Sequence, residues 1–129
     1  MILILSLLAA LHAGAEPALA QEPSGYFALE TIIMDAPARM GVRITRPDST
    51  LLVEVWPAMG PGPVRAKEAS LEGNRLRAVV EVHEGLNVEL RLVFTGDRVA
   101  GTWRIGEEAG DLTGRRGTAP DAPRGGSRR

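Results

Sequence analysis

The segment from Leu86 to Arg116 alternates apolar and polar residues and is interrupted by short turn sequences. In residues 86–95 the apolar side chains fall on one face, and polar or charged ones dominate the other. This period of two is typical of a β-strand with one dry side, whereas a helix repeats about every 3.6 residues. The apolar face consists of Val88, Leu90, Leu92 and Phe94. We therefore predict antiparallel strands in this segment.

The pair Gly96-Asp97 follows the first of these strands. Glycine at the first central position suits a type II′ turn, because that position needs a positive φ. A two-residue turn also sets the register of the hairpin. The predicted pairs are Phe94 with Val99, Leu92 with Gly101, and Leu90 with Trp103. Apolar residues then face one another, and Gly101 is expected to make room for the indole of Trp103.

From Gly25 onward the chain repeats this pattern, with Gly, Pro, Asn and Asp separating short strands roughly every 10–12 residues. The predicted strands are 26–34, 39–46, 51–56, 63–70, 75–83, 86–95, 98–105 and 111–116. This spacing indicates an all-β fold, an antiparallel up-and-down meander of about eight strands. We expect it to close into a small barrel, because an open sheet leaves two edges and one large face exposed. A two-sheet β-sandwich is the alternative.

One predicted strand, 63–70, fits the pattern poorly. Pairing it with strand 75–83 through the turn Gly73-Asn74 places Arg65 and Lys67 on the dry face. A bulge or a position at the edge of the sheet resolves this conflict.

The two ends of the chain differ in composition from the predicted barrel, which spans 25–117. Residues 1–20 resemble a signal peptide, with an apolar run over 2–11 and the small-x-small pattern Ala18-Leu19-Ala20. Because no Lys or Arg precedes the apolar run, the alternatives are a weak anchor or a buried strand or helix. Cleavage after Ala20 leaves a short polar lead, 21–24. Residues 118–129 are rich in Pro, Gly, Ser and Arg, which predicts a disordered tail.

Cysteine is absent, so disulfides, thiolate metal sites and a lipidated cysteine are excluded. A chain exported without disulfides is expected in a bacterial periplasm or secreted. Residues 21–129 hold all fifteen Lys and Arg and all acids except Glu16, so they are formally neutral. No overall field attracts this part to nucleic acid or to an anionic membrane. We expect a soluble monomer with no stable membrane insertion after signal cleavage.

Three stretches carry a resemblance to a known family: LEGNRLRAVVEV, LRLVFTGDRVAGTW and GDLTGRR. Over 71–116, and more loosely over 25–116, the chain resembles the small all-β domain of secreted bacterial proteins that often precedes an α/β-hydrolase or peptidase domain. The architecture is also similar to lipocalin-like and avidin-like barrels. The resemblance implies a barrel that binds a small ligand or packs against a neighbouring protein. Hydrolytic activity is not implied, because no hydrolase sequence follows.

The residues offer little that would support catalysis. His83 is the one histidine after residue 20, with Glu81 and Glu84 beside it. A metal site needs three or four ligands, so no metal is expected. Serines occur outside any Gly-x-Ser-x-Gly motif, which leaves a catalytic triad unsupported. We predict a protein that is not an enzyme and needs no cofactor.

Aromatic side chains are the remaining candidates for function. Alternation points Phe27, Phe94 and Trp103 inward, where they either pack the core or line a cavity for an apolar ligand. Trp56 faces outward before the loop PAMGPGP, which contains Met59. We therefore predict an exported, non-catalytic binding protein for a small apolar ligand or lipid, with Phe27, Trp56, Phe94 and Trp103 as ligand-binding residues. The alternative is an accessory module that docks on a secreted partner through Trp56 and Met59.

Overall fold

The computed structural model describes residues 22–120 and contains one nine-stranded antiparallel sheet with almost no helix. The strands are β1 (Gly25–Ile33), β2 (Ala36–Thr45), β3 (Leu52–Trp56), β4 (Val64–Arg65), β5 (Glu68–Glu72), β6 (Arg75–His83), β7 (Leu86–Thr95), β8 (Arg98–Ile105) and β9 (Glu108–Arg116). A single 3₁₀ turn, η1 (Pro47–Ser49), joins β2 to β3. The predicted signal peptide 1–20 and the tail from residue 121 lie outside the described residues.

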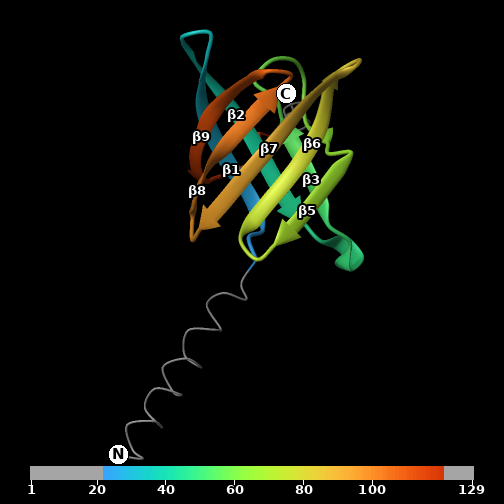
Figure 1. Cartoon of the computed structure of the whole chain (residues 1–129). Helices are drawn as coiled ribbons and strands as arrows, with labels where there is room; N and C mark the ends of the chain where they lie inside the picture. Colours follow the sequence, from blue (N-terminus) through green and yellow to red (C-terminus); the bar gives the residue numbers. More distant parts are fainter. Residues whose placement is uncertain (1–21, 121–129) are drawn as a thin grey trace, which may run out of the picture.

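The sheet has the strand order β4-β3-β2-β1-β9-β8-β7-β6-β5. Strands that pair are consecutive in sequence, except for β1 and β9, which pair to join the two halves of the chain. The consecutive strands β4 and β5 lie at the two edges of the sheet. The up-and-down meander is therefore confirmed. Figure 1 shows the sheet curled around its own inner face, with the strands running steeply between two ends. In residues 22–120, no helix is long and apolar enough to cross a membrane.

Two details of the predicted architecture are not exact. The sheet has nine strands rather than eight, and it forms a half-barrel rather than a barrel closed by a continuous ladder. Both differences come from the segment predicted as strand 63–70. Its first part, β4, pairs with β3, and its second part, β5, pairs with β6. The change of partner occurs where the Ala66 N–H donates to the Val53 carbonyl and the Lys67 N–H donates to the Val79 carbonyl, both at 2.8 Å.

This split also resolves the conflict at Arg65 and Lys67. β4 and β5 are the two edge strands of the sheet, and both cations are exposed to solvent. The expectation of an edge position is confirmed. A charged side chain at a sheet edge also discourages pairing with another chain.

The β7–β8 hairpin has the predicted register. Phe94 lies opposite Val99, Leu92 opposite Gly101 and Leu90 opposite Trp103. Gly96 has a φ of 64°, as the first central position of a type II′ turn requires.

The first hairpin turns one residue earlier than predicted. Its central residues are Met34 (φ 51°) and Asp35 (φ 65°), the pattern of a type I′ turn. Pro37, expected in the turn, instead lies in β2 opposite Ile32. Proline has no N–H to donate, but β3 pairs only with β2 residues 41–45. The edge of β2 at Pro37 that faces away from β1 therefore has no strand to which an N–H would have to donate.

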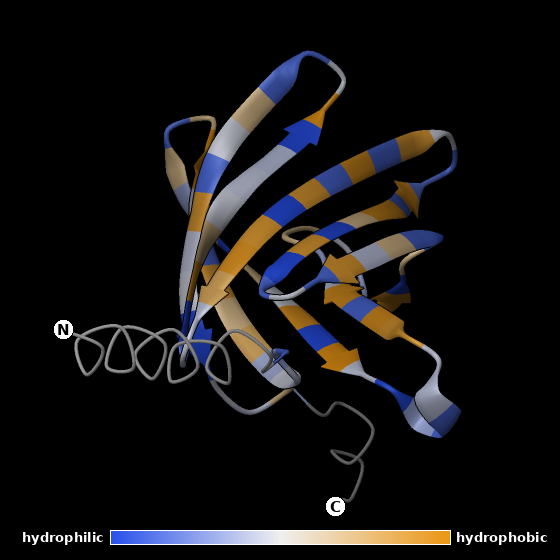
Figure 2. Cartoon of the chain, turned by 60° about the horizontal axis from the view of Figure 1, so that its bottom comes forward, coloured by the Kyte–Doolittle hydropathy of each residue, from blue (hydrophilic) through white to orange (hydrophobic). Residues whose placement is uncertain are grey.

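One apolar core fills the concave side of the sheet. Figure 2 shows apolar and polar residues alternating along the strands, and the buried residues are almost all apolar. The largest fully buried side chains are Phe27, Leu29, Ile44, Leu90, Leu92, Leu112, Val42, Val53, Val55 and Val80. Their burial supplies most of the driving force for folding, at about 25 cal/mol per Å² of apolar surface. A hollow interior along the whole barrel axis is therefore absent from the described residues.

Charged side chains cover the outer face, and some of them pair across strands. Arg77 on β6 donates to Glu89 on β7 at 2.7 Å, and Arg91 donates to the same carboxylate at 3.1 Å. The hydrogen bond from Arg77, together with the positive charges, lowers the pKa of Glu89 from its ordinary value. Such pairs keep the outer face solvated and opposite charges in register.

Two inward-facing glycines allow neighbouring strands to approach closely where the sheet curls. A Cβ at Gly101 would lie 2.0 Å from the Arg91 carbonyl oxygen, and one at Gly114 would lie 2.0 Å from the Ala28 carbonyl oxygen. Both obstacles are backbone atoms, which cannot rotate away. The curl of the sheet at β7–β8 and at β9–β1 therefore depends on the missing side chains.

We predict that Gly101→Ala lowers the free energy of unfolding by about 1–3 kcal/mol, because β7 and β8 must separate to admit the methyl group. Urea denaturation followed by circular dichroism measures this loss. Gly117→Ala is the matched control, since the nearest atoms to its Cβ are 3.9 Å away. Equal stability of the two variants would contradict the role given to Gly101.

Candidate apolar pocket at the upper end of the sheet

Alternating strand directions bring four connections to one end of the molecule. These are residues 34–35, 57–63, 84–85 and 106–107. We call this the upper end, since it lies at the top of Figure 1, away from the end at which β1 begins. The opposite, lower end carries η1, the turns 73–74 and 96–97, and the last residue of β9.

The lower end is closed by packed and hydrogen-bonded side chains. The rings of Phe27 and Phe94 meet edge to face, with centroids 4.8 Å apart. The guanidinium of Arg116 lies 4.8 Å from the centre of the Phe27 ring and donates to Asp97 and to the Ser24 carbonyl. Among the described residues, the hollow that remains at this end has a volume of about 240 Å³, and its lining includes the polar side chains of Glu22, Asn74 and Asp97.

The upper end instead contains a small pocket lined almost entirely by carbon. Its volume is about 150 Å³. The lining residues are Ile33, Met40, Val55, Pro57, Ala58, Met59, Val80, Val82, Leu86, Val88, Trp103, Ile105 and Glu108. They come from seven strands and from the 57–63 loop, which lies over the end of the core. Glu108 is the one charged residue among them.

The floor of the pocket is the indole of Trp103, which is only 6% exposed. Its Nε1–H donates to the Thr31 hydroxyl at 2.9 Å, and that hydroxyl donates to the Asp111 carbonyl oxygen at 2.6 Å. Both buried polar groups are thereby satisfied, which avoids the cost of burying them unpaired. The two bonds hold the indole in one orientation and tie β8, β1 and β9 together.

The space for the indole comes from a different glycine than predicted. A Cβ at Gly110 would lie 2.6 Å from Trp103 Nε1, whereas the obstacle at Gly101 is the backbone of Arg91. Gly110 lies opposite Trp103 in the β8–β9 pairing. The expectation for Gly101 is therefore wrong, and Gly110 has this role.

Exposed apolar side chains surround the pocket. Met59, in the loop over it, is 79% exposed, and Leu86 at the start of β7 is 41% exposed. Met34 at the tip of the first hairpin is 90% exposed. A positive φ at a methionine is strained, because its Cβ crowds the backbone. The fold thus presents Met34 to solvent at a cost, at the tip of the first hairpin.

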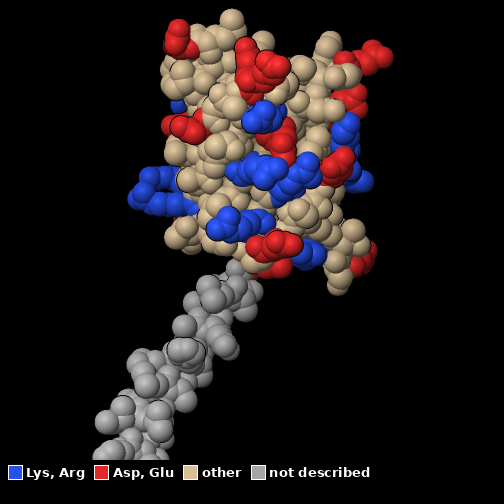
Figure 3. All heavy atoms as spheres, in the orientation of Figure 1, with Lys and Arg blue, Asp and Glu red and all other residues tan. Residues whose placement is uncertain are grey.

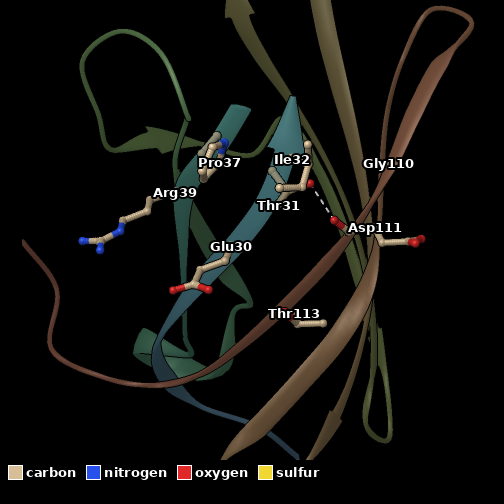
Figure 4. A pocket seen from close by; sticks show the side chains of 9 residues that line it. Glu30, Thr31, Ile32, Pro37, Arg39, Gly110, Asp111 and Thr113 are labelled. Carbon is tan, nitrogen blue, oxygen red and sulfur yellow. Dashed lines mark hydrogen bonds between the residues drawn. The ribbon is translucent and has the colours of Figure 1, made fainter. Parts of the chain in front are cut away.

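A larger, open groove lies on the outer side of the same end. It has a volume of about 590 Å³ and lies between β1 and β9, where their pairing stops at Glu30–Thr113. Figure 4 shows the two strands diverging, with the Thr31 side chain directed across the gap towards Asp111. The hydrogen bond from the Thr31 hydroxyl to the Asp111 carbonyl replaces the backbone hydrogen bonding that ends at Glu30–Thr113. Because the groove is more open and its walls include Glu30, Arg39 and Asp111, we consider the apolar pocket the better binding site.

The structure separates the residues that were predicted to bind a ligand. Trp103 lines the upper pocket, whereas Phe27 and Phe94 lie in the core at the lower end, 0% and 3% exposed. Trp56 lies on the outer face, where its ring meets Tyr26 edge to face at 5.1 Å and the Arg43 guanidinium at 5.2 Å.

The two residues proposed for partner contact lie on different surfaces. Met59 lines the upper pocket. Trp56 borders a groove with Tyr26 and Pro120 on the outer face. Burial next to the Trp56 ring also raises the pKa of Tyr26. The pair therefore does not form one patch around the 57–63 loop.

Most of the pocket lining was missed by sequence reasoning. Ile33, Val82 and Ile105 are inward-facing residues at the upper ends of β1, β6 and β8, and alternation alone predicts their phase. Which strand ends meet is set by the topology. A search for inward residues within two positions of the upper connections would have found them.

No group of three or more His, Asp or Glu side chains suited to a metal ion occurs within residues 22–120. His83 is exposed at the end of β6, and Glu81 beside it accepts a hydrogen bond from the Gly85 N–H at 2.9 Å. Glu81 thus stabilises the β6–β7 turn. No family model, curated protein or solved structure matches this chain.

We predict that Thr31→Val lowers the free energy of unfolding by about 1–3 kcal/mol, because it leaves the Trp103 N–H and the Asp111 carbonyl without their partner. Urea denaturation followed by tryptophan fluorescence measures the change. Thr113→Val is the control, since Thr113 is exposed on the outer face of β9 and should change stability by less than about 0.5 kcal/mol. Equal losses in both variants would contradict this assignment.

Proposed function

We propose that this chain is an exported, non-catalytic binding protein that takes a single apolar group in the pocket at its upper end. The observation that carries the proposal is the asymmetry of the two ends. At the lower end Phe27, Phe94 and Arg116 pack together, and the hollow beside them is lined largely by polar residues. The upper end keeps a carbon-lined concavity over Trp103. Binding sites for apolar groups are concave, mostly apolar and few per protein.

The size of the pocket favours one kind of occupant. Pockets for drug-sized ligands hold about 300–1,000 Å³, and this one holds about 150 Å³. That volume suits one apolar side chain and is too small for a whole lipid. The inner face beyond it is filled by core residues such as Leu90 and Val80, both 0% exposed. We therefore favour docking on a partner protein over storage of a lipid.

The rim supports docking as well. Methionine is flexible and polarizable, so Met34 and Met59 can adapt to a partner surface. Both are largely exposed at the upper end, and Leu86 adds further apolar area. Exposed apolar residues around a concave site mark surfaces where proteins interact. The resemblance of 71–116 to domains that precede secreted hydrolases supports an accessory role of this kind.

A small apolar ligand remains the second candidate, because the lining offers a single polar group, Glu108, to orient an occupant. We also propose that the half-barrel closes through β4 and β5, supported by the hydrogen bonds of Ala66 and Lys67 to β3 and β6. Such closure would hold the 57–63 loop over the pocket.

Methionine methyl groups provide a direct test of occupancy. Met40 and Met59 line the pocket, and Met34 lies at the exposed tip of the first hairpin. Titration with toluene, followed by methyl NMR, should shift the resonances of Met40 and Met59 to saturation and leave Met34 nearly unchanged. Ala58→Leu partly fills the pocket and should weaken toluene binding about tenfold, by analogy with the loss of one or two buried CH₂ groups. Ala100→Leu, on the exposed outer face of β8, is the control and should bind as wild type does.

A parallel titration with palmitate distinguishes the two candidates. Each buried CH₂ contributes about 0.8 kcal/mol, so a cavity that accepted the whole chain would bind palmitate orders of magnitude more tightly than toluene. We expect palmitate to bind no more tightly than toluene. Much tighter palmitate binding would favour the lipid candidate. Unshifted Met40 and Met59 resonances with both probes would refute binding at this pocket.

A further inference from the structure

The two ends of the molecule differ in charge although the part after residue 20 is neutral overall. The upper connections contain Asp35, Glu84 and Glu107, and none of the residues 34–35, 57–63, 84–85 and 106–107 is Lys or Arg. Figure 3 shows acidic side chains at the top of the visible face, while the basic side chains form a band across its middle and lower part. The apolar pocket therefore opens into an acidic rim.

Glu108 connects this rim to the pocket itself. It is exposed, lies opposite Ile105 in the β8–β9 pairing, and belongs to the lining. A group that enters the pocket must pass close to its carboxylate. The lower end carries both signs of charge, since Arg46 pairs with Glu22 and Arg116 pairs with Asp97. The acidic character thus belongs to the end that carries the pocket.

We propose that the upper end recognises a partner protein segment in which an apolar anchor side chain is flanked by Lys or Arg. This inference rests on the proposed function and specifies its partner. The pocket takes the anchor, and the rim carboxylates attract the flanking cations while repelling acidic segments. Long basic side chains also carry aliphatic stems, which can cover the exposed methyl groups of Met34 and Met59. Charge complementarity of this kind contributes mainly to specificity and to the association rate.

Three peptides of nine residues test the inference. They share a central phenylalanine and differ in the two residues on each side of it, which are lysine, serine or glutamate. Binding is measured from the Met40 and Met59 methyl resonances at low salt. We expect the lysine peptide to bind about tenfold more tightly than the serine peptide and the glutamate peptide to bind most weakly. At about 0.5 M salt the three affinities should converge, because exposed charges are then screened.

Two double variants test whether the rim carboxylates cause the preference for the lysine peptide. Glu84→Gln with Glu107→Gln removes two carboxylates at the upper end. Asp48→Asn with Glu72→Gln removes two exposed carboxylates at the lower end, so both variants change the net charge equally. The first should abolish most of the lysine preference while toluene binding stays as in wild type. The second should retain the preference.

The outcomes test the basic partner, the role of the rim and the apolar pocket separately. Equal affinities for the three peptides at low salt, together with saturable toluene binding, would overturn the basic partner and leave the apolar pocket intact. A preference that both double variants lose equally would overturn the role of the rim. Failure of toluene to bind would refute the proposed function itself. If dodecylamine bound far more tightly than any of the three peptides, the occupant would be a cationic amphiphile rather than a protein segment.

Discussion

A single layer of sheet must bury its own apolar face, and every other feature of this structure follows from that constraint. The described chain has no second sheet and no helix to cover the inner side. Burial is achieved by curling, which needs close strand approach at a few points. Gly101 and Gly114 provide it, because their missing Cβ atoms would overlap the backbone of the neighbouring strand. The curl then brings the ends of distant strands together.

The seam between β1 and β9 shows how the curl is maintained where regular pairing stops. The ladder ends at Glu30–Thr113, and beyond it the Thr31 hydroxyl bonds to both Trp103 and Asp111. This arrangement positions the indole as a floor between the core and the upper pocket. A single buried hydroxyl therefore connects the stability of the sheet to the shape of the candidate site. Gly110 completes the arrangement by leaving room for the ring.

The two ends of the molecule differ in the side chains that they carry. Aromatic packing and Arg116 close the lower end, whereas the upper end combines a pocket, adaptable methionines and acidic residues. None of these features requires catalytic chemistry. They support the proposed role in recognition, in which an apolar anchor would supply most of the affinity and surrounding charges would select the partner. The strained φ of Met34 is consistent with a role in binding, because the turn exposes an apolar side chain that the core does not need.

Local patterns were sufficient for part of the fold. The alternation in residues 86–95 and the Gly96-Asp97 turn predict a hairpin whose register the structure confirms. Such features depend on neighbours in sequence, so a short stretch contains all the information. The first hairpin was less predictable: Pro37 signalled a turn but lies in a strand, since one edge of β2 has no partner there.

The sequence by itself determined the fold class, the inward phase of most strands and the meander order, because alternation and turn chemistry are local. Only the tertiary structure decided that 64–72 splits between β3 and β6, that Phe27 and Phe94 close one end, and that a pocket forms over Trp103 at the other. These outcomes depend on how far the sheet curls and on which strand ends then meet. Both are set by packing among residues distant in sequence, such as Trp103 with Thr31, which no local pattern records.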